Sequence, residues 1–290
     1  MLIRSRNVAL ALSGVTVMTA ATALVPGAEA APGSGTSPRG DLRPGQAYAG
    51  VGQSRSPRSQ RSRLAGTAKV PAGHLGGMDI SSWQGKVGWK AARALGARFA
   101  IAKATEGKGY KNPYFQQQYD GSYKAGMVHG AYHFALPAAS GGRAQADYFL
   151  AHGGRWSTNG RTLPGALDIE NNPYGRDACY GLSKKAMVAW IGAFTARYRD
   201  RTGRRPLIYT NAYWWRDCTG NDRSLAANPL WMARWRSKSP APLPGGWKKA
   251  AVWQYDDAGR FPGDQNGFRG TWKDLVAFTK KTGAPRASDR

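Results

Sequence analysis

The chain has 290 residues, enough for one large domain or two small ones. An apolar content of 41% is ordinary for a globular protein and allows a sizeable core, which excludes a chain that is disordered throughout. The charge is not ordinary, because 42 Lys and Arg against 17 Asp and Glu give a net charge of +25, which favours polyanionic partners such as nucleic acid, anionic lipid or an acidic cell-wall polymer.

Residues 1–30 have the three parts of a secretory signal peptide. Arg4 and Arg6 precede an apolar stretch from Val8 to about Val25, and Ala28-Glu29-Ala30 forms a small-residue cleavage site. A transmembrane helix is the alternative, but the cleavage site and the lack of another long apolar run argue against it. We therefore expect a secreted protein, cleaved after about Ala30, with no membrane span in its mature form.

Residues 31–75 are rich in Gly, Ser, Pro and Arg and show no hydrophobic period. Such a composition buries too little apolar surface to offset the entropy of ordering, so we expect a disordered basic pro-segment or linker. A wall-binding arm is a second interpretation. Most of the excess charge lies further on, since the chain from Gly76 onward carries 33 basic and 15 acidic residues.

From Gly76 onward, short apolar runs alternate with helical patterns. The seven strands that this alternation predicts are Gly77–Ser81, Phe99–Ala104, Gly130–Phe134, Ala166–Glu170, Leu207–Thr210, Leu230–Ala233 and Val252–Tyr255. The five predicted helices are Trp89–Leu95, Pro113–Ala125, Arg143–Ala151, Ser183–Thr202 and Trp272–Thr282.

Strands that alternate with helices indicate an α/β fold with a largely parallel sheet, either open or closed into a barrel. Ser183 is suited to begin its helix as an N-cap, and Gly203 follows the same helix where a C-terminal stop belongs. Few helical patterns follow Thr202, so we expect loops to join the last strands.

The two cysteines, Cys179 and Cys218, are expected to form a disulfide, because their number is even and the signal peptide directs the chain to an oxidising compartment. The four histidines do not cluster with them at the spacings of zinc ligands, so no metal site is expected.

Two carboxylates, Asp168 and Glu170, close the predicted strand Ala166–Glu170. Residues i and i+2 of a strand point to the same face, with Cα atoms about 6.5–7 Å apart. In a barrel they would project into one cavity at the carboxyl ends of the strands, where catalytic groups lie in βα barrels. Asp79 ends an earlier strand in the same way. A structural role, as a turn cap or an arginine partner, is equally consistent with this spacing.

Seven stretches in one order resemble glycoside hydrolase family 25, the secreted N-acetylmuramidase lysozymes. The resemblance covers about Gly76 to Phe278. The stretches are GMDISSWQG (77–85), AIAKATEGKGYKNPYF (100–115), GAYHFALP (130–137), AQADYF (144–149), LPGALDIE (163–170), LIYTNAYWW (207–215) and AVWQYDDAGRFPGDQNGF (251–268).

The resemblance implies an irregular, flattened β/α barrel, similar to a TIM barrel but with fewer helices than strands. Residues 76–283 would form the catalytic domain, followed by a tail of residues 284–290. The implied activity is hydrolysis of the β-1,4 bond between N-acetylmuramic acid and N-acetylglucosamine in peptidoglycan, by a monomer that needs no cofactor. The basic surface would add attraction to anionic wall polymers.

The resemblance also implies roles for four acids. Glu170 matches the general acid, which needs a raised pKa to deliver a proton to the glycosidic oxygen. Asp168 would stay charged and either stabilise the oxocarbenium-like transition state or orient the substrate's 2-acetamido group. Asp79 matches an acid on the floor of the site, and Asp264 one at its rim. Retaining, inverting and substrate-assisted mechanisms all remain open.

Substrate-binding positions follow from the same blocks and from the need for aromatic faces and polar groups in a glycan site. For each aromatic residue, burial in the core is the alternative. His133 is interpreted either as a proton shuttle or as a hydrogen-bonded core residue. The predicted substrate-binding residues are Lys103, Glu106, Tyr132, Tyr209, Trp235 and Trp253.

Three other functions remain to be weighed. A non-catalytic wall-binding module of the same fold predicts a missing carboxylate among Asp79, Asp168 and Glu170, yet all three are present. A basic nucleic-acid-binding or membrane-active protein predicts a basic stripe or a basic amphipathic helix, whereas the Lys and Arg residues here are scattered, so no specific nucleic acid is expected. A chitin- or glucan-cleaving enzyme would share the chemistry and differ in its subsites.

Overall fold

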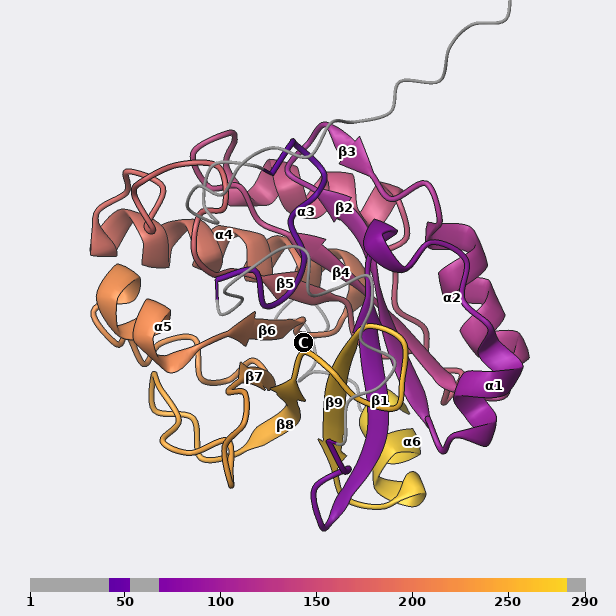
Figure 1. Cartoon of the computed structure of the whole chain (residues 1–290). Helices are drawn as coiled ribbons and strands as arrows, with labels where there is room; N and C mark the ends of the chain where they lie inside the picture. Colours follow the sequence, from indigo (N-terminus) through magenta and orange to yellow (C-terminus); the bar gives the residue numbers. More distant parts are fainter. Residues whose placement is uncertain (1–41, 53–67, 281–290) are drawn as a thin grey trace, which may run out of the picture. The chain divides into compact units, whose positions relative to one another are not determined.

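The computed structural model describes residues 42–52 and 68–280 (Figure 1). The described residues contain nine strands in one sheet. They are β1 (His74–Ile80), β2 (Phe99–Glu106), β3 (Tyr110–Lys111), β4 (Val128–Phe134), β5 (Ala166–Asp168), β6 (Leu207–Thr210), β7 (Leu230–Ala233), β8 (Ala250–Asp256) and β9 (Asp264–Arg269).

Eight of these strands close into a barrel. The sheet order is β1-β9-β8-β7-β6-β5-β4-β2-β3, and β1 also pairs with β2, which closes the ring and leaves β3 as a short attachment to β2. The pairs from β1 through β2, β4, β5, β6 and β7 to β8 are parallel, whereas β9 runs antiparallel to both β8 and β1. The predicted irregular β/α barrel is therefore confirmed.

The described helices other than the last pack on the outside of the barrel, and all five predicted helices are present. Ser183 caps α4 by accepting a hydrogen bond from the Ala186 amide, and Gly203 ends the helix with a left-handed φ of 73°. The helices are a short 3-10 turn, η2 (Ser82–Gln84), and α1 (Trp89–Ala94), α2 (Phe115–Lys124), α3 (Gly142–Ala151), α4 (Lys184–Thr202), α5 (Ala212–Thr219) and α6 (Trp272–Lys280).

Two elements of the last third were not predicted. Helix α5 follows β6 where a loop was expected, and the Asn211 side chain caps it by accepting from the Trp214 amide. Strand β9, with the polar sequence DQNGFR, completes the ring although it has no apolar alternation. The expectation that loops join the last strands is therefore wrong for the connection from β6 to β7.

Alternation along the strands separates an inner core from an outer one. On β5, Ala166 packs inside the barrel with Tyr132 and Tyr209, whereas Leu167 packs outside, among buried residues of α3, α4 and α5. Asp168 is two residues beyond Ala166, so it shares the inner face of β5. The alternation of side chains along β5 therefore directs the Asp168 carboxyl group into the barrel.

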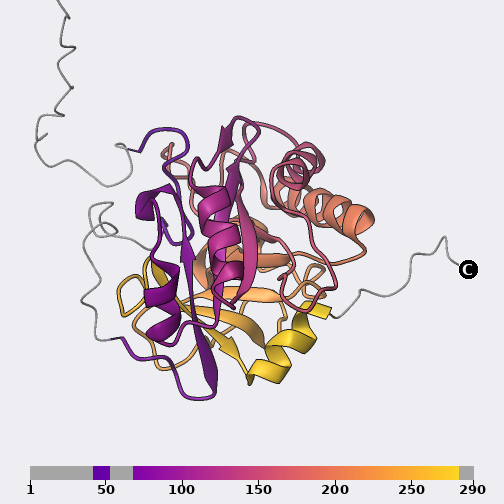
Figure 2. The same ribbon diagram turned by 90° about the vertical axis from the view of Figure 1, so that its right-hand side faces the viewer.

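The two ends of the barrel are covered by different parts of the chain. Leu275 of α6, drawn in yellow in Figure 2, joins the inner core where the strands begin. Ala49 joins the same core from residues 42–52, the cleft segment, which is drawn in indigo and crosses the end where β4 and β5 finish (Figure 1). The carboxyl ends of the strands therefore lie beneath the cleft segment.

The prediction of a disordered segment over residues 31–75 is wrong for two stretches. Ala47, Tyr48 and Ala49 are at most 2% exposed, and β1 begins at His74. The packing holds because the cleft segment hydrogen-bonds to side chains of the barrel, contacts that composition does not reveal. The predicted signal peptide and the tail from Gly283 onward lie outside the described residues. In residues 42–52 and 68–280, every helix is too short or too polar to cross a membrane.

Candidate active site

Four acids lie at the end of the barrel that the cleft segment covers. Asp168 is the last residue of β5, and Glu170 follows two positions later. Asp79 of β1 stands opposite Asp264, the first residue of β9, in the antiparallel register. All four are at most 3% exposed. The structure thus brings together the four residues predicted to be catalytic.

Gln254 of β8 connects two of these acids. Its Nε2 donates to Asp79 Oδ2 at 2.9 Å and to Asp264 Oδ2 at 3.2 Å. Its Oε1 accepts from the Tyr209 hydroxyl at 2.8 Å and from Trp235 Nε1 at 2.7 Å. This amide therefore fixes the orientation of two predicted catalytic acids and two predicted sugar-binding aromatic residues.

Asp79 receives a second amide. Asn266 of β9 donates from Nδ2 to Asp79 Oδ2 at 2.6 Å, and its Oδ1 accepts from Trp231 Nε1 at 2.7 Å. Burial raises the pKa of Asp79 to about 7, although the hydrogen bonds from Gln254 and Asn266 lower it. Asp79 is thus held in place while remaining able to change protonation near neutral pH.

Glu170 accepts one backbone amide at each carboxylate oxygen. The Gly50 N–H donates to Oε1 and the Gly52 N–H to Oε2, both at 2.6 Å. Burial raises the pKa of Glu170 to about 8, against these two hydrogen bonds, which lower it. The raised pKa expected of a general acid is present.

Asp168 differs from the other acids in its hydrogen bonding. Both carboxylate oxygens are buried and have no hydrogen-bond donor among the described residues. Burial raises the pKa of Asp168 well above its usual range, and the charges of Glu170 and Asp79 raise it further. Burial under the cleft segment therefore opposes a charge on Asp168, and the expectation that Asp168 stays charged in the working enzyme stays a prediction.

Lys103 and Glu106 form a buried ion pair beside the acids, with Nζ and Oε2 at 2.5 Å. An irregularity in the pairing of β2 with β4, between Lys103 and Thr105, shifts the alternation of β2. Because of this shift, two residues three positions apart meet. Tyr174, which the sequence did not single out, donates its hydroxyl proton to Glu106 Oε1 at 2.5 Å.

The predicted aromatic residues divide into two groups. Tyr132 and Tyr209 face the inner core, and Trp235 reaches Gln254. Trp253 is not brought to the acids, because it precedes Gln254 on β8 and therefore points to the opposite face. Its indole N–H donates to the Arg234 carbonyl at 2.8 Å. The inward residue of this stretch is Gln254, a polar residue inside an apolar run, and that contrast could have identified it.

His133 takes the core interpretation. It is fully buried and stacks on Phe194, with Thr105 Oγ1 at 2.8 Å from Nδ1 and Gln145 Oε1 at 2.9 Å from Nε2. Burial lowers the pKa of His133 to about 4, so its ring is neutral.

Cys179 and Cys218 form a disulfide, as predicted. It ties the loop that follows Glu170 to the last turn of α5. The loop that leaves the acids is thereby anchored to the outside of the barrel.

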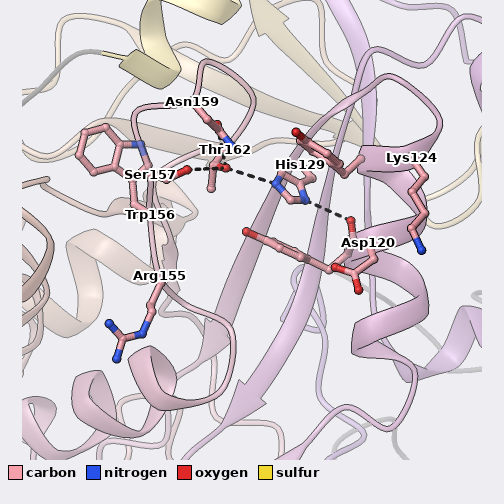
Figure 3. A pocket seen from close by; sticks show the side chains of 10 residues that line it. Asp120, Lys124, His129, Arg155, Trp156, Ser157, Asn159 and Thr162 are labelled. Carbon is pink, nitrogen blue, oxygen red and sulfur yellow. Dashed lines mark hydrogen bonds between the residues drawn. The ribbon is translucent and has the colours of Figure 1, made fainter.

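Two cavities lie at the other end of the barrel. One, of about 540 Å³, is bordered by α2, the start of β4 and the loop before β5, where His129 bonds Thr162 and the Tyr119 carbonyl (Figure 3). The second, of about 1220 Å³, is rich in cations. Its basic lining residues are Arg204, Arg205, Lys248, Lys249 and Arg269.

Within residues 42–52 and 68–280, no group of three or more His, Cys, Asp or Glu side chains is placed to hold a metal ion. Asp79, Glu170 and Asp264 accept hydrogen bonds from amide groups, whereas Asp168 has no donor among the described residues. Carboxyl groups arranged in this way are suited to proton transfer and to stabilising positive charge.

The chain matches known proteins over this whole region. The family model of glycosyl hydrolases family 25 matches residues 78–264. Lysozyme M1 of Streptomyces globisporus is 44% identical over 282 residues, which cover 93% of this chain and 94% of the relative. An N,O-diacetylmuramidase of Chalaropsis sp is 48% identical over 203 residues, or 69% of this chain and 96% of the relative.

Solved structures agree with the sequence matches. A family GH25 lysozyme from Aspergillus fumigatus superposes with a TM-score of 0.70 at 45% identity, covering 72% of this chain and 100% of that structure. The bacterial lysozyme from Streptomyces coelicolor superposes with a TM-score of 0.69 at 46% identity, covering 72% of this chain and 98% of that one.

Proposed function

Because the chain belongs to glycosyl hydrolases family 25, we propose that it is a muramidase that hydrolyses the β-1,4 bond between N-acetylmuramic acid and N-acetylglucosamine in bacterial peptidoglycan. The relatives named lysozyme and N,O-diacetylmuramidase support this substrate. The observation that carries the proposal is the buried cluster of Asp79, Asp168, Glu170 and Asp264 at the carboxyl end of a closed barrel.

Glu170 is the proposed general acid. A glycosidic oxygen is a poor leaving group, so a proton must reach it as the bond breaks. Burial raises the pKa of Glu170 above its usual value, which favours the protonated carboxyl group that a general acid needs. After bond cleavage the carboxylate can take a proton from the attacking water.

Asp168 is the proposed partner of the sugar ring. Its two oxygens have no hydrogen-bond donor among the described residues, so both are open to a substrate group. When the cleft opens to solvent, the burial that raises its pKa is reduced, which favours the charged form. A carboxylate there would stabilise the developing oxocarbenium charge or accept a hydrogen bond from the 2-acetamido group.

The remaining acids and the ion pair have supporting roles in this proposal. Asp79 and Asp264, joined by Gln254, would bind and orient the sugar at the floor and rim. Lys103 and Glu106, with Tyr132, Tyr209 and Trp235, would bind further along the glycan.

We further propose export and wall attraction. The signal-peptide pattern of residues 1–30 supports secretion, and the Cys179–Cys218 disulfide is consistent with an oxidising compartment. The net charge of +25 and the basic cavity at the far end of the barrel support binding to anionic wall polymers.

Incubation of the purified protein with peptidoglycan, followed by analysis of the reducing ends, tests the function. The proposed activity yields fragments that all end in N-acetylmuramic acid. Fragments ending in N-acetylglucosamine, or no fragments from any form of the chain, would contradict it. O-acetylated walls belong in the same assay, because two relatives are named N,O-diacetylmuramidase.

A further inference from the structure

The cleft segment, LRPGQAYAGVG, runs directly over the proposed catalytic residues. Its first half contacts the ion pair. Lys103 Nζ donates to the carbonyls of Gly45 at 3.1 Å and Ala47 at 2.5 Å, while the Gly45 N–H donates to Glu106 Oε1 at 2.9 Å. Both members of the ion pair are therefore bound by the backbone of the chain itself.

Its second half contacts the acids. The Gly50 and Gly52 amides take both oxygens of Glu170, and Gln254 donates to the Ala49 carbonyl at 3.0 Å. Both oxygens of Glu170 already accept a hydrogen bond from a backbone N–H of the segment. A glycosidic oxygen therefore cannot approach this carboxyl group while the segment is in place.

Glycines allow this close approach. A Cβ added to Gly50 would come within 2.5 Å of Trp235, and one added to Gly52 within 2.5 Å of Glu170. Gly50 also has a φ of +107°, a conformation that favours glycine. The segment therefore has the backbone shape of a close-fitting ligand at the point where it meets Glu170.

Apolar burial accompanies the hydrogen bonds. Tyr48 is 2% exposed, and Ala49 packs with Tyr132, Tyr209 and Trp231 on the inner core of the barrel. Removing the apolar surface of these side chains from water stabilises the docked segment. A chance crossing of the cleft would not combine this burial with hydrogen bonds at both of its ends.

We propose that the cleft segment is an intramolecular inhibitor, which occupies the glycan-binding cleft and must leave before the chain hydrolyses peptidoglycan. The inference rests on the proposed function for the meaning of the cleft. The segment bonds the side chains of Lys103, Glu106 and Glu170, which are the residues proposed to bind the glycan. The segment and the glycan therefore cannot occupy the cleft at the same time.

The first test compares full chains on a short, soluble muropeptide oligomer. The double variant Gly50→Leu/Gly52→Leu places side chains against Trp235 and Glu170 and should displace the segment. We expect kcat/KM to rise at least tenfold, because apparent activity scales with the fraction of open molecules. An unchanged kcat/KM would overturn the proposal.

Two further variants control this test. Gly88→Leu adds the same side chain at an exposed site with no atom within 4 Å of the new Cβ, and should leave the activity unchanged. Tyr48→Ala removes the buried anchor without adding bulk, and should raise activity even if the double variant folds poorly.

The second test measures binding rather than catalysis. A fluorescent synthetic peptide of residues 42–52 should bind the Gly50→Leu/Gly52→Leu chain, detected as increased anisotropy, and unlabelled muropeptide should displace it. A peptide with leucine at both glycine positions should not bind. If the native peptide binds but no form of the chain cleaves peptidoglycan, the docking stands and the proposed function fails. If the native peptide does not bind, the inhibitor proposal fails.

Discussion

Asp168 and Glu170 are two residues apart, yet their surroundings differ. Glu170 accepts two backbone amides, whereas the oxygens of Asp168 have no donor among the described residues. Hydrogen bonds to a carboxylate favour its charged form, and burial opposes that form. The same strand end therefore supplies one carboxyl group that is oriented by two N–H donors and one that is open to a substrate group.

Glu170→Gln tests the proton donor. The amide keeps the shape of the side chain but cannot donate an acidic proton, so we expect kcat to fall by about 10²–10⁴-fold. The hydrolysis rate of a soluble muropeptide measures the effect, and the exposed Asp217→Asn serves as the matched control. Turnover like that of the native protein in a folded Glu170→Gln chain would sink the assignment.

Gln254→Leu tests the positioning of Asp79. The substitution removes a hydrogen bond that lowers the pKa of Asp79, so that pKa rises further above its usual value. If hydrolysis needs ionised Asp79, the ascending limb of the pH–rate profile moves to higher pH and kcat falls about tenfold or more. A lower rate with an unmoved profile would indicate a purely structural role for Gln254.

At the scale of single residues, the sequence predicted the acids better than the residues that hold them. Asp79, Asp168 and Glu170 were identifiable because a carboxylate at the end of an apolar strand conflicts with its neighbours. Tyr174 acts through a contact with Glu106, far away in the chain, so a local pattern gives it no distinct signal. Gln254 has only the weak signal of a polar residue inside an apolar run. Trp253 was selected because it is aromatic, but the parity of β8 directs Gln254 inward instead.

Among the elements, prediction depended on where each one obtains its hydrogen bonds and its core. Helix α4 has a cap, a stop and nineteen residues of helical pattern, so its bounds agree with the sequence to within one residue. Strand β9 shows no apolar alternation, because its buried residues Asp264 and Asn266 bond polar groups of neighbouring strands, the Gln254 amide and the Asp79 carboxylate, rather than packing in an apolar core. Its polar sequence indicates a loop until the barrel around it is known.

The link between the loop after β5 and α5 leads to a prediction on stability. Replacing Cys179 and Cys218 with serine removes a covalent link between residues 39 positions apart. In the loop-entropy model, such a link contributes about 2–4 kcal/mol to the free energy of unfolding. We expect the melting temperature to fall by roughly 5–15 °C, measured by calorimetry in oxidising buffer. Equal melting temperatures for the native and serine chains would show that the loop is held by other contacts.

For the molecule as a whole, the acids beneath the cleft segment make stability depend on pH. The pKa values of Glu170 and Asp79 rise to about 8 and about 7, above their unfolded values, so the closed chain holds more protons than the unfolded chain. The contribution of these two acids to the free energy of unfolding is therefore fully present below about pH 4, and it is lost as the pH rises through their folded pKa values. The charged or titratable groups around the acids include Lys103 and Glu106 on β2, Tyr132 on β4, Asp168 on β5, Tyr180 in the loop after β5, Tyr209 on β6 and Asp264 on β9.

We therefore expect the melting temperature of the full chain to fall between pH 5 and pH 8, and Glu170→Gln to reduce this fall. Calorimetry at a series of pH values at constant ionic strength measures both slopes. A melting temperature that rises over this range in the native chain would contradict the sign.

The basic surface predicts that the rate of lysis of intact walls depends on salt, whereas the rate of cleavage of short soluble substrates does not. The Debye length shrinks from about 10 Å at 0.1 M to about 3 Å at 1 M salt, so attraction to an anionic polymer weakens severalfold or more. Lysis of intact walls should slow accordingly, while cleavage of a soluble oligomer with few charges changes little. Equal losses on both substrates would show that the charge does not target walls.

Two double variants that reverse charge test which part of the surface attracts the wall polymer. Lys248→Glu/Lys249→Glu alters the basic cavity, and Lys184→Glu/Lys185→Glu makes the same charge change at the start of α4. If the cavity binds the polymer, the first pair reduces wall association in a sedimentation assay more than the second. Equal effects would indicate a diffuse attraction from the whole surface.

The backbone amides on Glu170 also suggest a chemistry for inhibitors. Gly50 and Gly52 each donate one N–H to a separate carboxylate oxygen, and neither carries a side chain at the point of contact. A small molecule with two N–H donors at the same spacing, and no substituent between them and the acid, would engage Glu170 without imitating a sugar ring. Residues 42–52 thus provide a peptide template for drug-like ligands that bind a glycosidase through its acid.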